Sequence, residues 1–128
     1  MAVILVPASG EDIMIDWMTW RPTVALLVRA AILPTGEREE RCLANGCGGH
    51  LSEAEALQAA DYLETVVAKM QPGERLLSDG STTSQPKDYT VPISEWDKNE
   101  MNNRYSADYK VLKEFAEFCR RSGGFDVL

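Results

Sequence analysis

Residues 106–128 read SADYKVLKEFAEFCRRSGGFDVL, and nearly every position in this stretch has an identifiable structural role. Ser106 is of a type that favours the N-cap of a helix, and Gly123 and Gly124 favour its end. Between them, apolar side chains recur at the three- and four-residue steps that line one helical face: Leu112, Phe115, Phe118 and Cys119. The pattern predicts an amphipathic helix over about residues 107–122, with a packed apolar tail after it.

A second amphipathic helix is predicted over about residues 53–70. Ser52 and Glu55 have the spacing of a capping box, in which each side chain accepts a backbone N–H of the other residue. The apolar stripe that follows has helical spacing and consists of Leu57, Ala60, Leu63, Val67 and Met70. Pro72 and Gly73 then end the helix.

Strands are predicted around these helices. The earlier ones, which could form a meander, are residues 2–6, 12–20, 23–33 and 41–44, and two shorter ones are residues 75–77 and 89–93. The alanines of residues 23–33 leave a helix open for that segment. Residues 78–88 are small and polar, which indicates a mobile loop or a long hairpin connection. The sequence thus predicts one α+β domain, residues 1–128, in which an antiparallel sheet of about four to six short strands is packed by two amphipathic helices.

The charge is unbalanced and unevenly distributed. Twenty acidic residues against 13 basic ones give a net charge of -7, which disfavours direct binding to nucleic-acid phosphates. Between Glu37 and Glu64 there are seven acidic residues, offset only by Arg38 and Arg41. This negative region would attract a partner with a basic surface, although a solvated acidic face that keeps the protein soluble is the simpler interpretation.

Five glutamates flank the turn before the first helix and are the predicted docking residues: Glu37, Glu39, Glu40, Glu53 and Glu55. A strand over residues 12–20 would turn Trp17 and Trp20 to opposite faces of a sheet. One of the two would then be exposed, and we expect Trp20 to be the aromatic anchor at the partner interface.

The location is predicted to be cytoplasmic. The longest apolar run, residues 23–33, contains Arg29 and is too short to cross a bilayer, so no membrane association is expected. Three cysteines form an odd set, which does not resemble the disulfide framework of a secreted protein.

Metal binding is suggested by Cys42, Cys47 and His50, because thiolate and imidazole are zinc ligands and the spacing is C-x4-C-x2-H. The remaining cysteine, Cys119, falls on the apolar face of a predicted helix and is better explained as core. We therefore expect no metal and no cofactor, and a metal-stabilised domain is the third hypothesis for this chain.

Catalysis has two candidate sources. Cys47 with His50 as its base would make a nucleophile, but no third residue can be named that orients the imidazole. An acidic cleft is the other source, since Glu11, Asp12 and Asp16 lie near two tryptophans that could raise a carboxyl pKa. No catalytic residue is assigned on these grounds.

No family motif is recognised in the chain. The leading hypothesis is a small acidic cytoplasmic protein that binds a partner protein and occludes it, in the manner of an inhibitor or an immunity protein, a comparison that rests on composition alone. A small enzyme that uses Cys47 and His50, or the acidic cleft, is the alternative.

Overall fold

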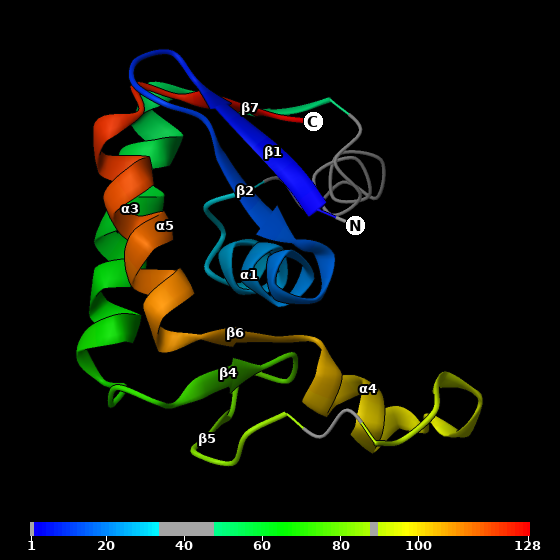
Figure 1. Ribbon diagram of the computed structural model, residues 1–128. Helices are drawn as coiled ribbons and strands as arrows, with labels where there is room; N and C mark the ends of the chain where they lie inside the picture. Colours follow the sequence, from blue (N-terminus) through cyan, green and yellow to red (C-terminus); the bar gives the residue numbers. More distant parts are fainter. Residues whose placement is uncertain (1, 34–47, 88–89) are drawn as a thin grey trace.

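A computed structural model describes residues 2–33, 48–87 and 90–128. The predicted α+β class is confirmed, with helices packed against antiparallel sheets (Figure 1). The elements in chain order are β1 (Ala2–Pro7), β2 (Ile13–Asp16), α1 (Trp17–Arg29), β3 (Gly49–Leu51), α3 (Glu53–Ala68), β4 (Arg75–Leu77), β5 (Thr82–Thr83), η1 (Ile93–Glu95), α4 (Lys98–Arg104), β6 (Ser106–Asp108), α5 (Tyr109–Arg121) and β7 (Phe125–Val127).

The C-terminal strand β7 lies inside the first sheet, whose order is β2-β1-β7-β3 with every pair antiparallel. Just beyond the strand, Ile4 and Leu128 exchange two backbone hydrogen bonds of 2.9 Å. Side chains alternate across a strand, so every second residue of β1 and β7 faces the core. These inward residues are fully buried: Val3, Leu5, Phe125 and Val127. The predicted packed tail is therefore confirmed.

Helices α3 and α5 lie side by side against this sheet (Figure 1). The predicted capping box starts α3, because Ser52 N–H donates to Glu55 Oε1 at 2.9 Å and Glu55 N–H donates to Ser52 Oγ at 3.2 Å. On α5 the apolar face joins a cluster of rings in which the centroid of Phe125 is 6.0 Å from Phe115 and 5.2 Å from Phe118. Both helices that the sequence predicts are thus present.

The strand predicted over residues 23–33 is wrong, because α1 occupies Trp17–Arg29. Asp16 caps this helix, with Oδ1 accepting Thr19 N–H at 3.0 Å, so the strand predicted over residues 12–20 also ends there. An apolar run of this length suits either a central strand or a well-buried helix. Here α1 is buried between the first sheet and β6 (Figure 1), and its packing there selects the helix.

A second antiparallel sheet has the order β5-β4-β6 and confirms the strand predicted at Arg75–Leu77. β4 and β5 form a hairpin, in which Leu77 N–H donates to Ser81 O at 2.8 Å. Residues 78–81 form the turn of this short hairpin and Thr82–Thr83 return as β5, so residues 78–88 are not one long connection to the strand predicted at residues 89–93.

Three local predictions differ from the structure or lie outside it. Ser106 does not cap α5 but lies in β6, where it pairs with Leu77, and the N-cap residue is Asp108. Residues 90–93 form no strand, since Pro92 lacks a backbone donor and a 3₁₀ turn begins at Ile93. The strand predicted at residues 41–44 lies outside the described residues.

Candidate binding groove

Two of the five predicted docking glutamates lie in the described chain. Glu53 is exposed in the first turn of α3. Glu55 is half-buried, and its carboxylate is already bonded to Ser52 N–H as part of the capping box. The others, Glu37, Glu39 and Glu40, lie outside the described residues. Acidic docking at this turn stays a prediction, and one of its members has a structural role.

Trp20 is not the exposed anchor that the sequence predicted. Only 1% of its surface is accessible, and its ring packs edge-on against Phe115 with the centroids 5.4 Å apart. The expectation assumed strand alternation between Trp17 and Trp20, whereas both residues belong to a helix, where three positions correspond to most of one turn. Trp20 therefore contributes to the core.

The chemistry suggested by cysteine and histidine is not assembled in the described residues. His50 is exposed in β3, and its Nδ1 lies 2.6 Å from Asp126 Oδ1 on the neighbouring strand. Cys119 is buried on α5, as predicted, and burial raises the pKa of its thiol to about 12. Cys42 and Cys47 lie outside the described residues. Within residues 2–33, 48–87 and 90–128, no group of three or more potential metal ligands occurs.

Of the acidic cluster near the tryptophans, Asp16 has a helix-capping role. Its two carboxylate oxygens accept hydrogen bonds from Thr19, one from N–H at 3.0 Å and one from Oγ1 at 2.8 Å. These bonds hold the carboxylate at the start of α1, which explains the residue without a catalytic role.

A cavity of about 640 Å³ lies beside β4 and is lined by three short segments, residues 72–75, 85–87 and 108–110. Its lining includes the buried Arg75, which donates to Gln85 O at 2.8 Å, to Asn103 O at 2.6 Å and to Ser106 Oγ at 3.1 Å. Because these bonds tie β4 to β6 and to the end of α4, Arg75 is explained as a structural residue.

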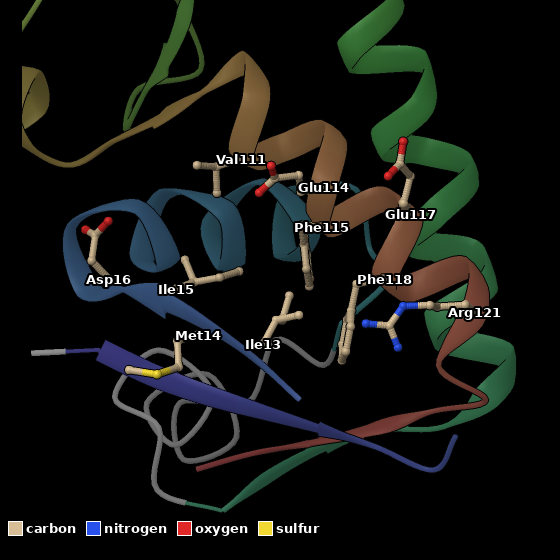
Figure 2. A pocket seen from close by; sticks show the side chains of 10 residues that line it. All are labelled: Ile13, Met14, Ile15, Asp16, Val111, Glu114, Phe115, Glu117, Phe118 and Arg121. Atoms are coloured by element: carbon tan, nitrogen blue, oxygen red, sulfur yellow. The ribbon is translucent and has the colours of Figure 1, made fainter. Parts of the chain in front are cut away.

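A cavity of about 340 Å³ lies between β2 and α5 and differs in character. Figure 2 shows Ile13 and Ile15 of β2 pointing toward Phe115 and Phe118 of α5, with the charged side chains around them. Among the described residues, the groove is lined by Ile13, Met14, Ile15, Asp16, Val111, Glu114, Phe115, Glu117, Phe118 and Arg121. We refer to this cavity as the β2–α5 groove.

One wall of the groove is an open strand edge. Within the described residues, β2 pairs only with β1, so its other side has no strand partner. Ile4 directs its backbone groups to Leu128, on the side of β1 away from β2. Ile4 is paired with Met14 in the register, and in an antiparallel ladder both members of such a pair direct their N–H and C=O away from each other. The backbone of Met14 therefore points outward from the sheet.

The rim of the groove is charged. Glu114 and Glu117 are exposed on α5, and Asp16 lies at the end of β2. Arg121 lies at the other end, where its guanidinium is 4.9 Å from the ring centroid of Phe118 and Nη2 donates to Glu11 O at 3.1 Å. Three carboxylates and one guanidinium around an apolar floor give the groove a net negative rim with one positive end.

Of the residues predicted to bind a partner, the three in the described chain, Glu53, Glu55 and Trp20, do not line this groove. Two sequence signals bear on it: the alternation of Ile13 and Ile15, and the recurrence of Glu114, Glu117 and Arg121 beside the apolar face of α5. Neither signal shows that β2 is an edge strand or that α5 lies next to it, so the groove could not be derived from the sequence.

Comparisons with known proteins give no analogue for the groove. No protein-family model matches the chain, and neither the curated proteins nor the solved structures contain a match. Within the described residues, no helix has both the length and the apolar character needed to cross a bilayer. Any function for the groove must therefore be argued from its own geometry.

Proposed function

We propose that the protein binds a partner protein by accepting an extended segment of it into the β2–α5 groove, as an added strand beside β2. The observation that carries this proposal is the coincidence of an open strand edge with an apolar cavity along it. In binding by strand addition, backbone hydrogen bonds to the edge provide affinity, and pockets for alternate side chains provide specificity.

The groove's dimensions suit a short aliphatic segment. A cavity of about 150 Å³ holds a molecule the size of benzene. At about 340 Å³, the groove has room for roughly two side chains of that size. Side chains on one face of a strand are two residues apart, so we expect aliphatic residues at two alternate positions of the bound segment.

The charge of the rim favours a basic segment. Glu114 and Glu117 are exposed above the apolar floor, and the whole chain carries a net charge of -7. Opposite charges accelerate association and exclude acidic competitors.

Binding a segment of a partner in this way suffices for a protein that occludes its partner, as an inhibitor or immunity protein does. The odd set of three cysteines leads us to propose the cytoplasm as its location.

The first prediction concerns the strand edge. A library of random seven-residue peptides with free carboxyl termini is screened against the purified protein, and bound peptides are measured by fluorescence anisotropy. Met14→Pro removes the outward N–H of β2 while the side chain it replaces is 70% exposed, and proline is tolerated at strand edges. We expect Met14→Pro to bind about tenfold more weakly than Met14→Ala, which removes the same side chain but keeps the backbone N–H.

A charge control accompanies this measurement. Glu114→Lys and Glu95→Lys change the net charge equally, but Glu95 lies in η1, outside the groove. Both substitutions should weaken the binding of basic peptides slightly through the net charge. Glu114→Lys should weaken it much more than Glu95→Lys does, because only Glu114 lines the groove. If Met14→Pro does not fold, hydrogen exchange of the Met14 backbone amide in the wild-type protein replaces this measurement. Bound peptide is expected to slow that exchange. A screen without binders, or binders that leave Met14 unprotected, would contradict the proposal.

A further inference from the structure

The direction of the bound segment follows from the two ends of the β2–α5 groove. We infer that the groove binds the C-terminus of its partner, with the terminal carboxylate on the guanidinium of Arg121. This inference rests on the proposed function, because it presupposes a strand added to β2.

Arg121 is held at one end of the groove and faces it (Figure 2). Its guanidinium is fixed by the hydrogen bond to Glu11 O and by its position over the ring of Phe118. Within the described residues, no carboxylate lies at ion-pair distance from Arg121, whereas the adjacent Arg120 is paired with two carboxylates on α3. A guanidinium carries five donors in a planar fork, which matches a carboxylate with two parallel hydrogen bonds.

The strand directions bring a C-terminus to that end. β2 runs from Ile13 to Asp16, and α5 runs the opposite way, so that Arg121 lies near the start of β2 and Val111 near its end (Figure 2). All pairs of the first sheet are antiparallel. A strand added antiparallel to β2 enters beside Asp16 and finishes beside Ile13. Its last residue therefore arrives at Arg121.

The opposite end selects a cation. Asp16 and Glu114 line the groove there, and neither forms an ion pair within the described residues. Strands rise about 3.4 Å per residue, so the four residues of β2 correspond to about four residues of ligand. The segment we expect has an aliphatic C-terminal residue, a second aliphatic residue two positions earlier and Lys or Arg two positions before that.

The second prediction tests the terminal carboxylate. The acetylated peptide Lys-Ser-Val-Ser-Val and the binders from the library are each prepared with a free and with an amidated carboxyl terminus, and the two dissociation constants are compared. Hydrogen bonds to a charged group correspond to about ten- to hundredfold in affinity, so the free acid should bind tighter by that factor. Arg121→Gln should reduce the ratio to near one.

Arg120→Gln is the matched control, because it removes the same charge from the neighbouring position and leaves the groove unchanged. It should keep the wild-type ratio. The ratio is independent of a variant's stability as long as the protein is folded. Equal binding of acid and amide, with both still weakened by Met14→Pro, would overturn the carboxylate inference and leave the proposed function standing. A library without any binder would overturn both.

Discussion

Cys119 illustrates how the environment of one residue suppresses its chemistry. Its sulfur is on the buried face of α5, and the residue is 1% exposed. Burial raises the pKa of the thiol from 9.0 to about 12, because the thiolate would lose its hydration. The thiolate is the reactive form of cysteine, so Cys119 is inert in the folded protein at neutral pH.

The third prediction follows from that shift. In a variant with Cys42→Ser and Cys47→Ser, we expect a thiol reagent at pH 8 to modify Cys119 only after denaturant is added. The folded state holds the proton more tightly than the unfolded state, so the contribution to stability is complete below about pH 9 and is lost as pH rises toward 12. Subtracting the pH dependence of Cys119→Ala isolates this effect. Rapid modification of the native protein would contradict the burial.

At the scale of elements, the connection from α5 to β7 fixes how the C-terminal strand enters the sheet. Gly124 has a φ of +101° and passes close to the start of α3. A Cβ at this position would lie 2.9 Å from Leu51 O and 3.0 Å from Glu53 N, and both atoms belong to backbone that cannot turn aside. The strand and the helix thus meet at a position that only glycine fits.

The fourth prediction compares two glycines. Gly73 has a similar φ of +94°, but a Cβ there would meet nothing within 4 Å. Gly73→Ala should therefore lose only the roughly 1–2 kcal/mol of a left-handed backbone. Gly124→Ala should lose about 1–3 kcal/mol more, because the neighbouring backbone must also shift. Urea unfolding measures both, and equal losses would show that the contact with Leu51 is not tight.

The whole molecule depends on its last strand. β7 separates β1 from β3, so within the described residues the N-terminal hairpin has no strand pairing with β3, which precedes α3. Phe125 and Val127 are buried in the core on the same strand. Removing β7 would take away backbone pairing on two sides as well as this apolar contact.

The fifth prediction is a truncation after Gly124. We expect the shortened protein to show no cooperative thermal transition by circular dichroism, because β1 and β3 lose their shared partner and the core loses two side chains. Leu128→Ala is the control, since its side chain is 57% exposed while its backbone still bonds Ile4. This variant should melt close to the wild type. Native-like melting of the truncated chain would refute a central role for β7.

Local signals were enough to predict some elements. The capping box at Ser52 and the apolar stripe after it predicted α3, and the face of Phe115 and Phe118 predicted most of α5. Each of these signals lies within one or two helical turns, where side chains and backbone interact without help from the rest of the chain. The apolar tail and the buried cysteine followed from the same helix.

Tertiary structure decided α1, the burial of Trp20 and the β2–α5 groove. The apolar residues after Pro22 fit a strand or a helix equally well, and only burial between two sheets selects the helix. The groove joins Ile13 and Ile15 to Phe118 and Arg121 from the far end of the chain. A cavity depends on which surfaces meet, and that is set by the shared core, whereas sequence patterns report only the periodicity of each segment.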